Sequence, residues 1–284
     1  MKKIIKRAVP KMIGTYLNAL SWVAPHRAGE RLYKLFGTPR KGRLRPKDEE
    51  FLRGAQHKQY TYQNHIIHTY IWGKGAKIIT LLHGWESNAA RWRGFINELR
   101  KKNDYTIVAI DAPAHGQSGG TMFNVPLYAN FLHTVAQHYP PNILMGHSIG
   151  GTTTIFYATH FDSPSVQYIV SLAAPSEMAE MSVEMKNILG VNDRTIAAFE
   201  AVILQKFNMR MQDFSTRRFA QSLSLLGLVI HDIEDTIVPY RNAEAIAGAW
   251  QNATLITTQG LGHAVNSKAL ITDTCQRLAD VKIV

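Results

Sequence analysis

Cysteine is almost absent from this sequence, since Cys275 is the one cysteine among 284 residues. A single cysteine excludes an internal disulfide and a zinc site built from several cysteines, and it leaves the cellular compartment open. Internal repeats and low-complexity segments are missing as well, and no uninterrupted apolar stretch is long enough to span a bilayer. The remaining composition, 45% apolar and 19% charged, is typical of a soluble globular protein with a sizeable core.

Acidic residues are scarce only at the N-terminal end. Up to Lys58 the sequence holds fifteen Lys and Arg against four acids, whereas the rest holds seventeen of each, so the net charge of +11 comes entirely from the first segment. A basic field over the whole chain, as nucleic-acid binding would need, is therefore not expected. No nucleic-acid-binding motif accompanies the charge.

The basic N-terminal segment predicts a helical extension over residues 1–58. After the basic opening 1–7, apolar residues recur at helical spacing as far as Pro25, and a shorter helical pattern ends at Gly37. Three interpretations stay open: a secretory signal, a helix that lies on a membrane surface, and a helical arm that packs on its own domain. We expect a cytoplasmic protein, with peripheral membrane contact through this helix left open.

From about residue 59 onward the pattern alternates between strands and helices. Continuous apolar strands between amphipathic helices indicate a mostly parallel sheet covered on both faces, an α/β fold. The expected strands are a pair within 59–72, then 77–82, 105–110, 143–145, 166–173, 226–231 and 253–258, and the expected helices are 89–102, 125–139, one from 152, 241–250 and 265–278.

Residues 176–224 break this alternation. They contain no clear strand and are too long for an ordinary connection, so they predict two or more inserted helices. Five of the nine methionines lie here, together with several phenylalanines. Such side chains suit a surface that accommodates apolar ligands, and they equally suit the core face of extra helices.

The motif Gly146–Gly151, with the sequence GHSIGG, follows the short apolar run 143–145. A serine at a strand-to-helix turn needs small neighbours so that its hydroxyl points out of a crowded corner. Ser148 is therefore the candidate nucleophile.

A serine nucleophile needs a base and a carboxylate that orients the base. Downstream of Ser148 the histidines are His160, His231 and His263, and His263 is preferred because it lies in a glycine-flanked loop after the last strand. Asp235 is the preferred carboxylate, ahead of three alternatives: Asp232, which we expect to brace its loop, Glu234, and Glu177.

The oxyanion that forms when Ser148 attacks a carbonyl also needs fixed donors. Ile149 offers its backbone N–H at the start of the following helix. Trp85 offers another, directly after the expected strand 77–82, where Gly84 lets the backbone approach.

With these residues, the sequence resembles the α/β-hydrolase superfamily in four segments from about residue 60 to the C-terminus. The segments are His83–Trp85, Asp111–Ser118, Gly146–Gly150, and Asp235–Pro239 with Gly262-His263. The resemblance implies a mainly parallel eight-stranded sheet, a Ser148-His263-Asp235 triad and a helical cap within 176–224. It departs at Ala114, where the family pattern usually has glycine. A serine rather than an aspartate nucleophile sets the chain apart from dehalogenases and epoxide hydrolases of this fold.

The resemblance and the residues together predict hydrolysis of a carboxylic ester or thioester with an apolar acyl group, through an acyl-Ser148 intermediate. No cofactor or metal is expected. The alternatives are acyl transfer to another acceptor, amide cleavage, and a non-catalytic, membrane-associated binding protein on a hydrolase fold. The expected organisation is an extension over 1–58 and a catalytic domain over 59–284 with the cap inserted at about 176–224.

Overall fold

The computed structural model describes residues 2–281, with side chains described for residues 8–281. The basic opening expected at residues 1–7 therefore lies outside the described side chains. The chain forms two compact units, each composed of two segments. The α/β unit contains residues 39–176 and those from 216 on, and the helical unit contains the residues up to 38 together with 177–215.

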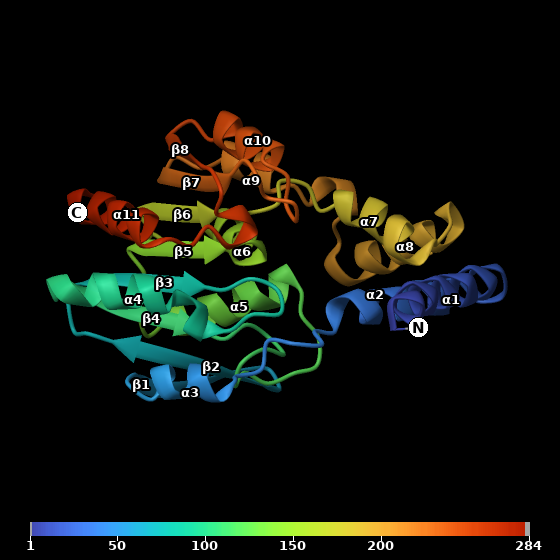
Figure 1. The fold of residues 1–284 in the computed structure, drawn as a ribbon, viewed down its shortest axis with the longest axis horizontal. Coiled ribbons are helices and arrows are strands. Elements are labelled where there is room, and N and C mark those ends of the chain that lie inside the picture. Colours follow the sequence, from blue (N-terminus) through green and yellow to red (C-terminus); the bar gives the residue numbers. More distant parts are fainter. Residues whose placement is uncertain (1, 282–284) are drawn as a thin grey trace. The chain divides into compact units, whose positions relative to one another are not determined.

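The α/β unit is built on one eight-stranded sheet with the order β1-β2-β4-β3-β5-β6-β7-β8 (Figure 1). The strand β2 pairs antiparallel with β1 and with β4, and all other neighbours are parallel. The strands are β1 (Gln56–Tyr62), β2 (His65–Trp72), β3 (Lys77–Leu82), β4 (Tyr105–Ile110), β5 (Ile143–His147), β6 (Tyr168–Leu172), β7 (Leu226–Asp232) and β8 (Ala253–Thr258). The predicted eight-stranded, mostly parallel sheet is thus confirmed.

Helices cover both faces of this sheet, with α4 and α11 packed together on one face (Figure 1). The helices α5 and α6 pack side by side, as do α9 and α10. The helices of this unit are α3 (Pro46–Leu52), α4 (Arg93–Leu99), α5 (Val125–Ala136), α6 (Ile149–His160), α9 (Thr216–Gln221), α10 (Arg241–Ala249) and α11 (Lys268–Asp280), with short 3₁₀ helices at Ala89–Trp92, Arg100–Lys102 and Gly262–Ala264.

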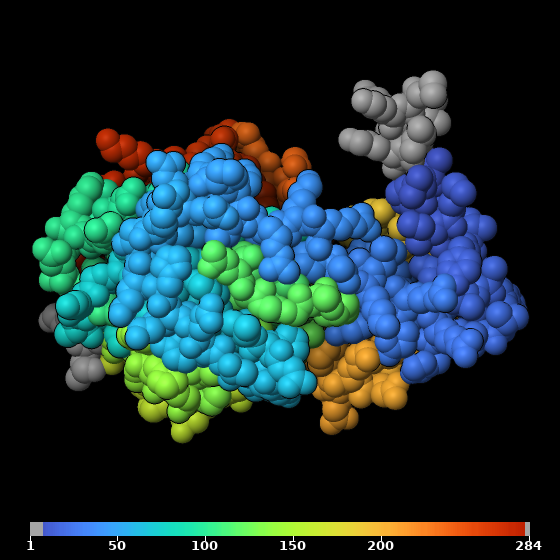
Figure 2. Space-filling view, turned by 90° about the horizontal axis from the view of Figure 1, so that it is seen from below, coloured from blue at the N-terminus to red at the C-terminus, as the bar shows by residue number. Residues whose placement is uncertain are grey.

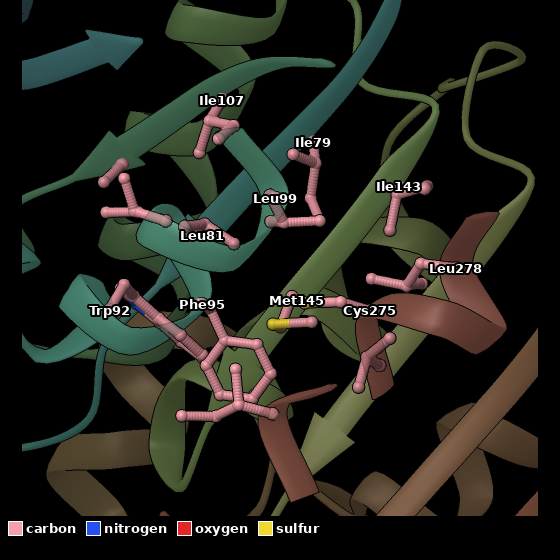
Figure 3. Packing of buried hydrophobic residues seen from close by; sticks show 14 of the residues in the cluster. Ile79, Leu81, Trp92, Phe95, Leu99, Ile107, Ile143, Met145, Cys275 and Leu278 are labelled. Carbon is pink, nitrogen blue, oxygen red and sulfur yellow. The ribbon is translucent and has the colours of Figure 1, made fainter. Parts of the chain in front are cut away.

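The core beneath α4 and α11 consists of apolar side chains from the central strands and from these two helices. Figure 3 shows Trp92 and Phe95 near the start of α4 packed with Met145 of β5, and Cys275 of α11 joins the same cluster. Burial of this much apolar surface is the main favourable contribution to folding. It also holds β3 and β5 side by side, with Leu82 opposite Gly146.

Three strands have the predicted bounds and the last helix does not. The strands 77–82, 105–110 and 253–258 are observed as expected. The last helix begins at Lys268 rather than at Val265, because Val265 has φ +38° and the Ser267 side chain caps the helix by accepting a hydrogen bond from the amide of Leu270.

The helical unit joins the N-terminal segment to the long interval. Its helices are α1 (Lys2–Val23), α2 (Pro25–Gly37), α7 (Glu180–Leu189) and α8 (Asp193–Phe207), followed by a 3₁₀ helix at Met211–Asp213. The helix α2 packs against α8, and α1 packs against α7. Leu17 and Leu32 share one core with Met185, Phe199 and others from the interval.

The sequence left two roles open for the methionines of residues 176–224, a surface for apolar ligands or the core face of extra helices. The structure decides this for four of them. Met185 and Met211 are buried in the core of the helical unit, and Met178 and Met181 are partly buried against it. These side chains therefore pack the unit. The two units meet in the sequence after residues 38, 176 and 215. The sequence pattern did not indicate that the first segment and the interval form one helical unit.

Within residues 2–281, no helix combines the length and the apolar character needed to cross a bilayer.

Candidate active site

Ser148 occupies the turn between β5 and α6 and has φ +54° and ψ −127°. Positive φ is uncommon for any residue other than glycine, and its strain persists only where the surroundings fix the backbone. Here the fixing contact is the hydrogen bond that the Ser148 amide donates to the carbonyl of Leu172 on β6, at 2.7 Å. The sheet thus holds the serine in a sharp turn at its carboxyl edge.

The first and last glycines of the G-x-S-x-G pattern, Gly146 and Gly150, are required because no side chain fits at either position. A Cβ on Gly146 would lie 2.3 Å from the carbonyl oxygen of Gly150, and a Cβ on Gly150 would lie 2.3 Å from the carbonyl oxygen of Leu82. Real Cβ atoms do not approach backbone atoms so closely. The glycine spacing read from the sequence therefore reflects the close approach of α6 to β5 and to the end of β3.

Ser148, His263 and Asp235 lie in one hydrogen-bonded chain. The Nε2 of His263 is 3.1 Å from the Oγ of Ser148, and the Nδ1 is 2.8 Å from an Asp235 carboxylate oxygen. An ionised carboxylate only accepts hydrogen bonds, so Nδ1 carries the proton and Nε2 is left as an acceptor for the serine hydroxyl. The imidazole therefore has the tautomer that a general base needs.

The Asp235 carboxylate is fully buried, whereas the His263 side chain is 21% exposed. One carboxylate oxygen accepts from the amides of Ile237 and Val238, at 2.8 and 2.9 Å. The other oxygen is the one that faces His263. Backbone donors thus compensate the burial of a charge that would otherwise be costly.

His231 also contacts this carboxylate, a relationship that sequence reasoning missed. Its Nε2 lies 2.8 Å from the carbonyl oxygen of Val238 and 3.2 Å from the Asp235 oxygen that faces His263. Burial lowers the pKa of His231, so the ring is a neutral donor to both acceptors. The sequence feature that could have indicated this contact is the position of His231 near the end of β7, four residues before Asp235.

The other candidates from the sequence lie elsewhere. His160 is at the far end of α6 from Ser148 and stacks on Phe156. Asp232 braces the loop before His263, because its carboxylate accepts from the Leu261 amide at 2.9 Å. Glu177 belongs to the helical unit, where it accepts from the Ser215 hydroxyl.

Two further side chains hold the loop that carries His263, and the sequence did not point to either. The Nε2 of His147 donates to the carbonyl of His263 at 2.8 Å, and Arg91 donates to the next carbonyl, that of Ala264, at 2.8 Å. Burial lowers the pKa of His147 far below its usual value and so keeps the ring neutral. The candidate base is therefore fixed through its own backbone.

The two predicted oxyanion donors come from the residue after Ser148 and from the loop that follows β3. Ile149 is the first residue of α6, where amides have no acceptor within the helix. The loop His83–Trp85 lies directly against the serine, since a Cβ on Gly84 would be 3.0 Å from the Cβ of Ser148.

His83 fixes the peptide that carries the Trp85 amide. Its Nε2 accepts from the amide of Ala112 at 2.9 Å, so its Nδ1 carries the proton and donates to the Gly84 carbonyl at 2.8 Å. The Gly84 carbonyl and the Trp85 N–H belong to one planar peptide and point in opposite directions. Holding the carbonyl therefore sets the direction of the N–H.

The described part of the chain holds no group of three or more His, Cys, Asp or Glu side chains arranged to bind a metal ion.

Comparisons with known proteins agree with this architecture. The family of the alpha/beta hydrolase fold matches residues 77–223. A serine hydrolase-like protein of Danio rerio is 27% identical over 135 residues, which are 44% of this chain and 40% of that protein. A pimeloyl-[acyl-carrier protein] methyl ester esterase of Vibrio vulnificus (strain YJ016) is 26% identical over 153 residues, 52% of this chain and 54% of the esterase. The chain thus spans about half or less of these relatives.

A bromoperoxidase from Bacillus anthracis superposes with a TM-score of 0.63, at 16% sequence identity, over 80% of this chain and 100% of that structure. At this identity the likeness concerns the fold alone. Because the family match covers more than half of the residues and the sheet has the same architecture, the chain belongs to the α/β hydrolase fold family.

Proposed function

We propose that the protein is a serine hydrolase that cleaves a carboxylic ester or thioester. The observation that carries the proposal is the chain of hydrogen-bond distances from Ser148 through His263 to Asp235, 3.1 and 2.8 Å, at a serine held with positive φ. The same three residue types in this geometry generate a nucleophile on several unrelated folds. The esterase name of the Vibrio relative supports an ester as the substrate class.

In the proposed reaction the Ser148 oxygen attacks the substrate carbonyl carbon while its proton moves to Nε2 of His263. The oxyanion accepts hydrogen bonds from the amides of Trp85 and Ile149. The C–O or C–S bond to the leaving group then breaks, and His263 returns the proton to the departing alkoxide or thiolate. Water hydrolyses the acyl-serine by the same steps in reverse order, with His263 as the base.

Asp235 holds the imidazole in place and stabilises the imidazolium that forms at each step. The two amides act on the transition state because they are fixed before charge develops. Removal of one such donor costs on the order of 3 kcal/mol in the barrier. The acyl group predicted from the sequence is apolar, and a series of nitrophenyl esters with acyl chains from acetyl to dodecanoyl measures this preference.

The test compares Ser148→Ala with wild type in turnover of a short-chain nitrophenyl ester. We expect a loss of roughly 10⁴-fold or more, as for other serine nucleophiles. Ser224→Ala removes an exposed serine hydroxyl and should leave turnover unchanged. A fluorophosphonate probe should label wild type and not Ser148→Ala. Equal turnover by Ser148→Ala would show that Ser148 is not the nucleophile, and absence of labelling of wild type would favour a non-catalytic binding protein. Either result would overturn the proposal.

Product analysis distinguishes hydrolysis from transfer of the acyl group to an acceptor other than water. Addition of an alcohol or an amine leaves the product of a hydrolase largely the free acid. A new ester or amide as the main product would instead identify an acyltransferase on the same residues.

A further inference from the structure

The helix α1 presents a row of apolar side chains to solvent. Val9, Met12, Tyr16 and Val23 are between 47% and 82% exposed, and their spacing of three, four and seven residues places them on one face. The opposite face is buried in the helical unit through Leu17. The surface of α1 and α2 can be followed in blue in Figure 2. Such a contiguous apolar stripe on a surface helix marks an interaction site.

The same helix is cationic and carries no acid. Five Lys and Arg occur among the first eleven residues, and the first acidic residue of the whole chain is Glu30. Within the helical unit, Glu30 is paired with Lys206 at 3.0 Å, and Asp193 is paired with Lys186. Glu184, an exposed acid of this unit, belongs to α7 and not to α1.

Arginines lie on the exposed aromatic rings of α1. The Arg31 guanidinium is 5.2 Å from the centre of the Tyr16 ring and donates to its hydroxyl. The Arg194 guanidinium is 4.5 Å from the centre of the Trp22 ring, which is 67% exposed. Each ring thus combines an apolar body with a cation at its face. Amphipathic aromatic and basic side chains of this kind suit the boundary between acyl chains and phosphate head groups.

We propose that the exposed face of α1 binds the surface of an anionic lipid bilayer, with the helix lying in the interface. Met12, Tyr16 and Val23 would enter the region of the acyl chains, while Arg31 and Arg194, which lie on the exposed rings of Tyr16 and Trp22, would meet the phosphates. An amphipathic helix of this composition binds by buried apolar area together with attraction to anionic lipid. The proposal does not depend on the hydrolase activity.

Charge favours a lipid surface over a second copy of the chain as the occupant. Two-fold pairing of the α1 stripe would bring together two cationic helices, neither of which carries an acid, and this is unfavourable. An anionic surface instead neutralises them. The apolar stripe alone would not distinguish the two occupants.

The test uses the full chain and vesicles of phosphatidylcholine, with or without about a third phosphatidylglycerol. We expect co-sedimentation with the anionic vesicles that weakens as NaCl is raised, and little with phosphatidylcholine alone. Met12→Ser with Val23→Ser should lower the partition coefficient by about tenfold or more at unchanged charge. The matched control, Ile66→Ser with Leu226→Ser, removes two exposed apolar side chains from the α/β unit and should bind as wild type does.

Circular dichroism and the urea midpoint establish that both double variants are folded. Absence of binding to anionic vesicles by wild type would overturn the proposal. Equal binding by the α1 variant and wild type would do so as well. Sedimentation velocity covers the other occupant: a dimer of wild type that the α1 variant loses would assign this face to a second copy and would also overturn the lipid proposal.

Discussion

The Nε2 atom of His147 lies 2.8 Å from the carbonyl oxygen of His263. A carbonyl only accepts hydrogen bonds, so Nε2 carries the proton of a ring that burial keeps neutral. Its Nδ1 is buried and has no hydrogen-bond partner among the described residues. The residue that precedes the candidate nucleophile therefore holds the backbone of the candidate base, and the two parts of the site are fixed to each other.

His147→Phe keeps a ring of similar size and removes the donor. We expect kcat for ester hydrolysis to fall about tenfold, the equivalent of one lost hydrogen bond of ~1.4 kcal/mol, because His263 would sample positions away from Ser148. KM should stay within twofold, since the substrate loses no contact. Steady-state kinetics on a nitrophenyl ester give both constants.

His147→Gln serves as the conservative variant, because the glutamine amide nitrogen reaches about as far as the histidine Nε2 and can donate to the same carbonyl. It should recover most of kcat. If the Phe variant matched wild type, or if Gln were as slow as Phe, the hydrogen bond to His263 would have no positioning role.

His231 contacts Asp235, which is at the other end of the hydrogen-bonded series from Ser148 through His263. Its Nε2 lies 3.2 Å from the Asp235 oxygen that faces His263, and the ring is fully buried. In His231→Phe the carboxylate loses this donor, so Asp235 and the His263 ring that it orients are held less firmly. We expect kcat for a nitrophenyl ester to fall about tenfold, the equivalent of one lost hydrogen bond, while KM stays within about twofold.

His231→Gln retains an amide donor near the position of Nε2. Its kcat should therefore lie closer to that of wild type. A Phe variant that lost stability in urea but kept the wild-type kcat, or a Gln variant as slow as Phe, would contradict the assignment.

The sequence predicted those parts of the fold and site that depend on local pattern or on the rules of parallel sheets. The strand at Tyr105–Ile110, which is apolar except for Thr106, has the predicted bounds. Ser148, His263 and Asp235 follow different strands, and the carboxyl ends of parallel strands meet at one edge, so their proximity could be expected.

The contacts that support these residues were beyond the sequence pattern. His147 and Arg91 donate to backbone carbonyls more than a hundred residues away, and a carbonyl leaves no trace in the residue type that carries it. The helical unit was missed for a related reason. Its core pairs residues before 38 with residues after 177, and amphipathic periodicity shows that a helix has an apolar face without showing what covers it.

Asp111 makes stability depend on pH. Its carboxylate is fully buried at the end of β4 and accepts from the Tyr70 hydroxyl and from the amides of Ala89 and Gln117. Burial raises the pKa of Asp111 from 3.8 to about 6, despite these hydrogen bonds. The folded state thus favours the protonated form, and this contribution to stability is complete below about pH 3.8 and is lost as the pH rises through 6.

A pKa raised from 3.8 to about 6 corresponds to about 3 kcal/mol. The free energy of unfolding of wild type, minus that of Asp111→Asn, should therefore fall by about 2 kcal/mol between pH 4 and pH 7, because part of the change lies outside this range. Urea unfolding of both proteins at each pH measures the difference, and other groups that titrate alike in both cancel. A difference independent of pH would show that Asp111 is not protonated in the folded protein.

Ala114 holds the backbone conformation that glycine adopts most readily. Its φ is +65°, in the turn after β4 where the family pattern usually has glycine, and its amide donates to the carbonyl of Gly119 at 2.9 Å. The methyl group of an L-residue costs about 1 kcal/mol in this region. Ala114→Gly removes that cost and keeps the amide donor, but it also adds freedom to the unfolded chain. We expect a net rise of about 0.5 kcal/mol or more in the free energy of unfolding, measured by urea denaturation.

Ala112→Gly makes the same chemical change at a fully buried position without positive φ and should destabilise the protein. Destabilisation by both substitutions would show that the turn gains nothing from glycine.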